Sequence, residues 1–509
     1  METTTTITVT TAMTTAIEII ARVRTRVRLY AALAGAALLG GAGGCATSGP
    51  FADLIDHDSP LGETAGGDRT PAPAPATGMA SSRVVHLEIP EDAGPEQYVR
   101  LALERNPAIR AADERVRRLA NRIPQAESLD DPMLFITPIG EMAETAAGRV
   151  DVMSSVSQKL PFPGKLRTRG RIAAQTVAQA VQELQQVRLR VAADTRRTWW
   201  SFYYMTRAIE VTDQNRDLLA QFRLVAEAKY RAGTATQQDV LRASVEMSLL
   251  DDELIKLRQR RTTAVAMLNQ LLDRPVDRAL PAPRTRELEP TNLQLDAVLA
   301  AADRSNPEMA RIHERIEGYR QQRKLARLNR WPDLTLAFSY NLVSNDGLSP
   351  VANGLDQWWI GAGINLPIWA SRLNAAEFEA ARGMLQSISE LDSVTNQVAF
   401  RVQDALTRVE SQQRQVILFR DVIIPQARQA VDVSLSGYRT GKLDFLTLVD
   451  NWRKLFEFQV VYHLNLAEVE RSFADLQQAV GRTLDRNDAG SSAETRPREV
   501  VLNSPRVQP

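Results

Sequence analysis

The sequence has one cysteine and little histidine, and these two shortages exclude several kinds of site. Its 509 residues contain one cysteine and four histidines. A single cysteine excludes an intrachain disulfide and any cysteine-rich metal centre. The histidines form no pair at helical spacing, and the chain has neither a phosphate-binding glycine loop nor a nucleophile elbow. We therefore predict that the protein is not an enzyme, has no catalytic residue, and holds no cofactor or metal.

A large net charge is also missing. The formal charge is +1, and no long run of one sign occurs, so nothing indicates a nucleic-acid partner. Hydrophobic residues make up 44% of the chain and charged residues 24%, which is typical of a folded protein. The length would by itself suggest several domains.

The N-terminal region has the composition of a secretory signal. Four arginines at positions 22–28 precede an apolar run at 29–39, and Ala42-Gly43-Gly44-Cys45 follows. The run is short for a membrane span. A cysteine after small residues resembles the bacterial lipoprotein box, in which the thiol receives a diacylglycerol before cleavage, although Ala42 stands where that box prefers leucine. The residue after this cysteine is Ala46 rather than aspartate, which resembles lipoproteins that are sent on to the outer membrane.

We therefore predict a signal peptide at 1–44 and lipidation at Cys45. An ordinary signal with a bystander cysteine is the alternative, and the start at Met1 or Met13 stays open. Residues 45–90 are predicted to be a tether, because large apolar residues are scarce and prolines are frequent there. The polar residues 486–509 are predicted to be a flexible tail.

Between these segments the sequence repeats itself. Asn106-Pro107 recurs as Asn306-Pro307, and Tyr230-Arg231-Ala232-Gly233 recurs as Tyr438-Arg439-Thr440-Gly441. The offset drifts only from 200 to 208 residues across the ordered series of matches. A duplicated unit explains such a series, and we place the two copies at 91–283 and 284–485.

Each copy is predicted to contain helices on either side of a strand hairpin. Helices are expected at 96–128 and 295–330, where Pro107 and Pro307 require a break or a first helical turn. Period-two alternation predicts strands at 133–137, 150–159, 334–342 and 358–366. A stretch of 62 residues without glycine or proline between Gly170 and Gly233 predicts a very long helix. The pattern resumes to 274, and the second copy predicts helices at 384–424, 431–438 and 443–480.

The hairpins carry an apolar face that needs a cover. Its members in the second copy are Leu336, Phe338, Tyr340, Trp358 and Ile360. Either the strands pack on helices in a soluble core, or they form a barrel wall with lipid outside and a lumen inside. Four strands cannot close a barrel, so a barrel requires several chains. The envelope signal favours the barrel.

These residues resemble a known family. The two repeats, the long helices, the segment Leu160-Pro161-Phe162-Pro163-Gly164-Lys165 and the Tyr-Arg-x-Gly turns are similar to TolC-like outer-membrane efflux proteins, most of all to the heavy-metal and cation efflux branch. The resemblance implies a mainly α fold with a membrane β-barrel portion. Long coiled-coil helices would form a periplasmic α-barrel, and a homotrimer with four strands per protomer would form a twelve-stranded barrel.

The same resemblance implies partners and site residues. A periplasmic adaptor would contact the helix-turn tips at Tyr230, Arg231, Gly233, Arg439, Gly441 and Lys442. Asp239 and Tyr438 would hold a periplasmic gate closed, and Asp450 would line an acidic ring that attracts cations. Leu443 and Thr447 stand where a gating arginine and a second ring aspartate are expected, which puts a charged lock in doubt. The alternative for Asp450 is a solvated helix face.

The predicted function is an exit duct in the outer membrane, lipid-anchored and extending into the periplasm. An inner-membrane pump of the RND type would energise export of metal cations or small toxic compounds, since the chain shows no energy source of its own. Two alternatives remain. One is a periplasmic coiled-coil lipoprotein of structural function, and the other is the exit duct of a type I polypeptide secretion system.

Overall fold

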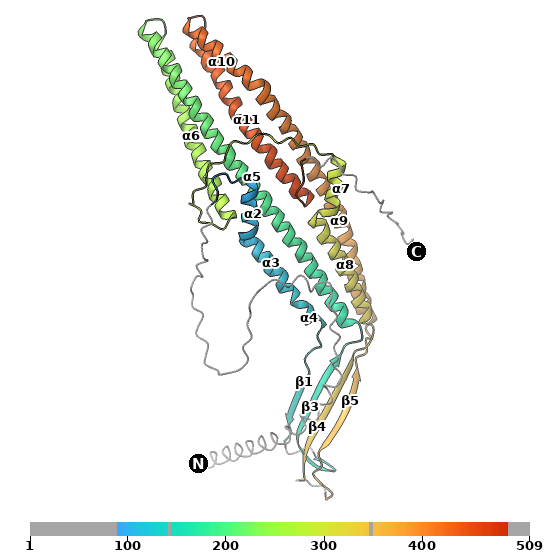
Figure 1. Ribbon diagram of the computed structural model, residues 1–509. Coiled ribbons are helices and arrows are strands. Elements are labelled where there is room, and N and C mark those ends of the chain that lie inside the picture. Colours follow the sequence, from blue (N-terminus) through green and yellow to red (C-terminus); the bar gives the residue numbers. More distant parts are fainter. Residues whose placement is uncertain (1–88, 141–143, 346–349, 487–509) are drawn as a thin grey trace, which may run out of the picture. The chain divides into compact units, whose positions relative to one another are not determined.

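The repeated sequence folds into two sets of corresponding elements, which Figure 1 shows in a computed structural model. The structure describes residues 89–140, 144–345 and 350–486. The first copy comprises α2 (Pro95–Arg105), α3 (Pro107–Ala120), α4 (Arg122–Glu127), β1 (Met133–Pro138), β2 (Glu144–Thr145), β3 (Gly148–Leu160), α5 (Lys165–Arg231) and α6 (Gln237–Leu271). The second comprises α7 (Leu295–Ser305), α8 (Pro307–Leu328), β4 (Leu334–Ser344), β5 (Gln357–Ile364), α9 (Ala370–Leu418), a π segment (Phe419–Ile423), α10 (Ile424–Arg439) and α11 (Phe445–Val480).

The opening helix of each copy is divided at an asparagine that precedes a proline. Asn106 Oδ1 accepts a hydrogen bond from Ala108 N at 2.9 Å, and Asn306 Oδ1 accepts one from Glu308 N at 2.9 Å. Proline lacks the donor that a continuous helix needs and tolerates the first helical position. The expected helices at 96–128 and 295–330 are therefore broken, and the first is broken again after Ala120.

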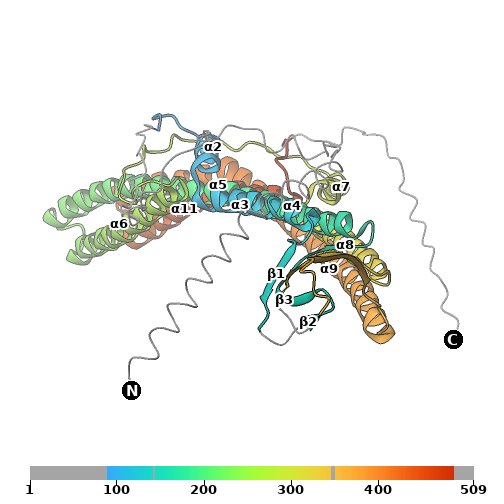
Figure 2. The same cartoon turned by 90° about the horizontal axis from the view of Figure 1, so that it is seen from below.

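The four main strands form one antiparallel sheet in the order β1-β3-β4-β5, with β2 paired to β3. The predicted strands are confirmed with small shifts of their ends. The two hairpins are not separate, because β3 of the first copy pairs with β4 of the second. Figure 2 shows the sheet as a curved layer.

The register places apolar side chains in a row across the sheet. Leu134 lies opposite Val156, Val156 opposite Phe338, and Phe338 opposite Ile360. The neighbouring row on the other face pairs Ser155 with Ser339. Because alternate residues of a strand face opposite sides, one face of the sheet is apolar and the other has small or polar residues at these positions.

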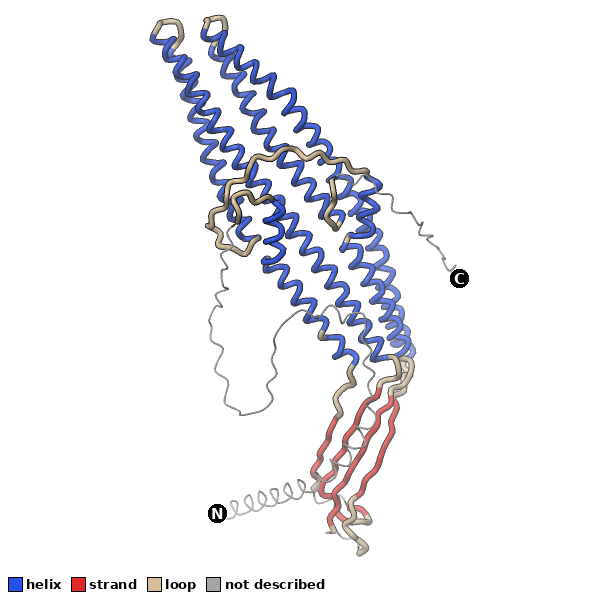
Figure 3. The backbone as a smooth tube through the Cα atoms, viewed as in Figure 1, coloured by secondary structure: helices blue, strands red, loops and turns tan. Residues whose placement is uncertain are grey.

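The long helices run from the strands to two tight turns at the opposite end of this unit (Figures 1 and 3). Helix α5 has 67 residues, so it extends roughly 100 Å at 1.5 Å per residue. The expected interruption between 424 and 431 is wrong, because helical structure continues from Ala370 through a π segment to Arg439. The wider π turn contains Asp421, the residue whose carbonyl the ring of Pro425 would meet in a regular α-helix.

Buried side chains form a main core and a second core nearer the turns. The main core centres on α5, α9 and α11 and includes Trp199, Ile312 and Leu476. The second includes Phe222, Tyr438 and Trp452. Helices of both copies contribute to each core, so neither copy completes its core alone. None of the described helices is both long and apolar enough to cross a membrane.

Candidate functional site

The two helix-to-helix turns have the same local structure. Gly233 and Gly441 adopt φ angles of +74° and +75°, in the left-handed region that glycine enters without penalty. Thr234 N donates to Lys229 O at 2.9 Å, and Lys442 N donates to Gly437 O at 2.8 Å. These bonds close the helix end in the manner of a Schellman motif.

The residues predicted to meet an adaptor lie together at these two tips. They are all exposed: Tyr230, Arg231, Gly233, Arg439, Gly441 and Lys442. The aromatic ring of Tyr230 and the cations Arg231, Arg439 and Lys442 offer an exposed surface to which another protein can bind. Their contact with an adaptor stays a prediction.

A hydrogen bond joins the two copies just behind the tips. The hydroxyl of Tyr438, on α10, donates to Asp239 Oδ2, on α6, at 3.0 Å. Tyr438 is 3% exposed, and its burial together with the neighbouring carboxylate raises the pKa of its hydroxyl. The tyrosine therefore stays neutral and keeps donating. The structure brings together two of the three predicted gate residues.

A cation that the sequence reasoning missed completes this contact. Lys229, near the end of α5, donates from Nζ to the carbonyl oxygen of Tyr438, and its ammonium lies 4.6 Å from the centre of the tyrosine ring. A cation over an aromatic face is stabilised by the ring quadrupole. Asp239, Lys229 and Tyr438 thus form one cluster, which we call the tip latch.

The copies differ at the position of this lysine. Lys229 lies four residues before Gly233, and Gly437 lies four residues before Gly441. A Cβ on Gly437 would approach Leu443 Cδ1 to 2.7 Å. Leu443 therefore packs on its own turn, in the space that glycine leaves. The cation beside the tyrosine comes from the first copy instead of from position 443.

The third predicted gate residue lies apart from the latch. Asp450 Oδ2 is 2.9 Å from Lys454 Nζ on the exposed surface of α11. Thr447 takes part in the cap at the start of that helix, where its backbone N–H donates to Asp444 Oδ1 at 3.1 Å. The hydroxyl and backbone N–H of Thr447 lower the pKa of the Asp444 carboxyl. The acidic ring of Asp450 requires other copies of the chain and stays a prediction.

A second contact between the copies, in this case an ion pair, lies further along α6 and α11. Arg453 Nε, on α11, is 3.1 Å from Glu246 Oε2, on α6. The glutamate side chain is 7% exposed, and its hydrogen bond raises the pKa of Arg453. Single-sequence patterning could not find this pair, because it depends on the relative rotation of two helices.

The predicted strand-face residues are exposed in the single chain. The exposed fractions are 42% for Leu336, 44% for Phe338, 65% for Trp358 and 73% for Ile360. Tyr340 is half-buried, and its hydroxyl donates to Asp356 Oδ2 at 2.5 Å. Large apolar side chains exposed in one continuous row indicate a surface that another phase or molecule covers.

The aromatic run in α5 is a packing cluster. Trp199, Trp200, Phe202 and Tyr203 are buried. Tyr203 Oη accepts from Arg286 N at 3.3 Å, which fastens the segment between α6 and α7 to the helices. The ring of His463 lies edge-on to Tyr203 at 6.5 Å. Burial and the charge of Arg207 lower the pKa of His463 to about 4.

We expect His463 to make the protein less stable in mild acid. An unfolded histidine has a pKa of about 6.5, so the unfolded chain takes up this proton first as the pH falls. The contribution of neutral His463 to the free energy of unfolding is fully present above pH 6.5 and declines until the folded imidazole titrates near 4. The loss amounts to about 3 kcal/mol. Denaturant titrations at pH 7.5 and 4.5 should show a smaller loss for His463→Phe than for the unaltered protein, and equal losses would contradict this role.

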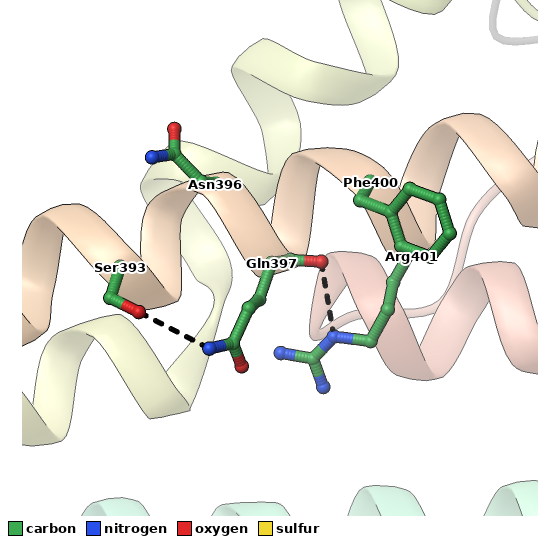
Figure 4. A pocket seen from close by; sticks show the side chains of 5 residues that line it. All are labelled: Ser393, Asn396, Gln397, Phe400 and Arg401. Carbon is green, nitrogen blue, oxygen red and sulfur yellow. Dashed lines mark hydrogen bonds between the residues drawn. The ribbon is translucent and has the colours of Figure 1, made fainter.

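One surface hollow lies on the middle of α9 (Figure 4). Its lining residues are Ser393, Asn396, Gln397, Phe400 and Arg401. All come from one helix, which cannot enclose a ligand, and Phe400 is 70% exposed. Among the described residues, no group of three or more histidine, aspartate or glutamate side chains could hold a metal ion.

Comparison with known proteins gives a consistent result. Residues 98–274 and 298–482 match a family model described as outer membrane efflux protein. A cobalt-zinc-cadmium resistance protein of Cupriavidus metallidurans is 22% identical, over 77% of this chain and 91% of that protein. A pyoverdine export outer membrane protein of Pseudomonas aeruginosa is 22% identical over 64% of this chain and 67% of its own length.

Solved structures share the fold. The CusC channel superposes with a TM-score of 0.65 and 18% identity, covering 77% of this chain and 93% of that one. The outer membrane protein VceC of Vibrio cholerae gives 0.64 and 19%, covering 77% and 97%. The predicted fold class is confirmed by these likenesses.

Proposed function

The chain belongs to the outer membrane efflux protein family, and we propose that it is the outer-membrane exit duct of a tripartite efflux system. The observation that carries this proposal is the row Leu134, Val156, Phe338 and Ile360 across four paired strands. An apolar row on one face and serines on the other is the pattern of a barrel wall between lipid and a polar lumen.

The barrel is proposed to need three chains. In the described sheet, β1 and β5 are the two outer strands, and unpaired strand edges are not stable in lipid. Joining β1 of one protomer to β5 of the next in a homotrimer gives a closed twelve-stranded barrel. The helices of three protomers would continue it as a periplasmic α-barrel, and exposed Phe400 would be covered by the neighbouring chain.

The duct is proposed to be passive. A periplasmic adaptor would bind the exposed tips and release the tip latch, and an inner-membrane pump of the RND type would supply the energy. Asp450 would form a threefold acidic ring that favours cations. Metal cations or small toxic compounds are the proposed cargo, which relatives named for cobalt-zinc-cadmium resistance and pyoverdine export support.

A lipid on Cys45 is proposed to hold the chain to the inner face of the outer membrane. This cysteine, the signal at 1–44, most of the tether at 45–90 and nearly all of the tail lie outside the described residues. The boundaries 91–283 and 284–485 for the copies stay proposals. The barrel already anchors the protein, so the lipid would aid sorting or assembly more than retention.

Extraction separates the duct from a soluble periplasmic spacer. The Cys45→Ala protein should still require detergent for release from membranes, because the apolar strand face remains. It should elute as a trimer and form channels in planar bilayers. The unaltered protein is the control for expression and sorting. Recovery of the variant in aqueous buffer as a folded monomer would contradict the proposal.

A further inference from the structure

Basic side chains gather where the strands join the helices. Arg167 and Arg171 lie within the first seven residues of α5, and Arg372 is the third residue of α9. At 1.5 Å per residue, all three lie within roughly 10 Å of the first residue of their helix. Both helices begin within a few residues of a strand end, since β3 ends at Leu160 and β5 ends at Ile364.

Three arginines of the junction, unlike Lys165, Arg327 and Arg330, have no ion-pair partner among the described residues. Lys165 is buried and bonds to Asp333 at 2.6 Å, and Arg327 and Arg330 share one carboxylate on α9. Arg167, Arg171 and Arg372 are exposed, and they form no ion pair with any residue that the structure describes.

Helical geometry indicates the side of α5 on which two of these charges lie. Lys165 points toward Asp333, which by strand alternation belongs with Thr335 on the face opposite the apolar row. A helix turns about 100° per residue, so Arg167 and Arg171 are rotated by roughly 200° and 240° from Lys165. They therefore project on the side of the apolar face.

Exposed tryptophans lie between the apolar row and the arginines. Trp331 precedes β4 and is 57% exposed, and Trp369 precedes α9 and is 65% exposed. Tryptophan is enriched where a membrane meets water. The order from the strands outward is thus apolar side chains, tryptophans and then arginines.

These arginines do not stabilise the helices that they begin. The N-terminal end of a helix carries a partial positive charge and favours acidic residues, yet the first turn of α5 has none. An unpaired cation there is stabilised by an anion from outside the chain.

We propose that Arg167, Arg171 and Arg372 form a docking surface for the anionic headgroups of phospholipids, in the leaflet at the helical end of the barrel. The proposal rests on membrane insertion of the strands. Each arginine near an anionic membrane surface contributes part of the electrostatic attraction to the headgroups, and salt weakens this attraction.

The test is lipid binding by the full-length trimer. Detergent-solubilised protein is mixed with phosphatidylglycerol and phosphatidylcholine, and bound lipid per protomer is counted by native mass spectrometry. We expect the variant with Arg167→Gln, Arg171→Gln and Arg372→Gln to lose at least about tenfold of its preference for phosphatidylglycerol. The preference of the unaltered protein should also shrink in high salt.

A matched variant controls for charge and folding. Arg260, Arg414 and Arg428 are exposed arginines on α6, α9 and α10, each far along the chain from the strands, and their replacement by glutamine should leave the preference unchanged. An unchanged preference in the junction variant would overturn the proposal. So would altered ion selectivity with unchanged lipid binding, because it would place the arginines in the lumen. Failure of the unaltered protein to insert into any vesicle would instead overturn the proposed duct.

Discussion

A channel carrying Asp239→Ala is expected to conduct far more current in planar bilayers than the unaltered channel. The substitution removes the acceptor of the Tyr438 hydroxyl, a bond of 3.0 Å between the two copies. A hydrogen bond to a charged group contributes about 1.5–3 kcal/mol. Its loss would shift the equilibrium between closed and open tips by roughly 10- to 100-fold.

Two further variants divide the tip latch into its parts. Tyr438→Phe keeps the ring beneath Lys229 and loses only the hydroxyl, so it should match Asp239→Ala. Lys229→Met removes the cation above that ring and should open the tip to a smaller extent. Lys442→Met is a suitable control, because the side chain of this exposed lysine at the second tip forms no hydrogen bond or ion pair with the described residues of the first copy. Unchanged conductance in both Asp239→Ala and Tyr438→Phe would remove the gate role.

The outline of this fold could be predicted from the sequence because its periods are long and regular. Alternation in 334–342 fixes a strand, and the absence of glycine and proline from 171–232 fixes a long helix. The pairing of Asp239 with Tyr438 came from the family resemblance. Local pattern could not supply it, because the two residues are 199 positions apart.

Other features depend on geometry that a periodic pattern does not contain. Lys229 reaches Tyr438 because α5 and α10 have a particular relative rotation, whereas periodicity indicates only which face of a helix is apolar. The pairing of β3 with β4 joins residues 174 to 195 positions apart, from Leu160 with Leu334 to Arg149 with Ser344, and a hairpin signal reports only neighbouring strands. The continuity of α9 and α10 was hidden by Pro425, whose cost the π segment relieves.

The buried pair at the junction predicts the largest loss of stability. Lys165 Nζ donates to Asp333 Oδ1 at 2.6 Å and to Trp331 O at 2.9 Å, and the two charged side chains are 3% and 8% exposed. Asp333→Asn would leave the ammonium buried without a counter-charge, which costs about 3–5 kcal/mol. We expect less trimer that resists dissociation in detergent gels and a lower denaturant midpoint. Glu377→Gln alters a partly buried carboxylate of the same junction, but its partners Arg327 and Arg330 are exposed and stay hydrated without it, so this variant should cost less stability.

The double variant Lys165→Met and Asp333→Asn tests what the pair is for. Replacing both charges of a buried pair is often nearly neutral for stability, whereas removing one is not. The pair joins the first turn of α5, in the first copy, to the start of β4, in the second. If the pair fixes the register between the copies, the double variant should regain stability. Its yield of correctly assembled trimer should nevertheless stay below that of the unaltered protein. Full recovery of both would mean that hydrophobic packing alone sets the junction, and the pair would then have no role in assembly.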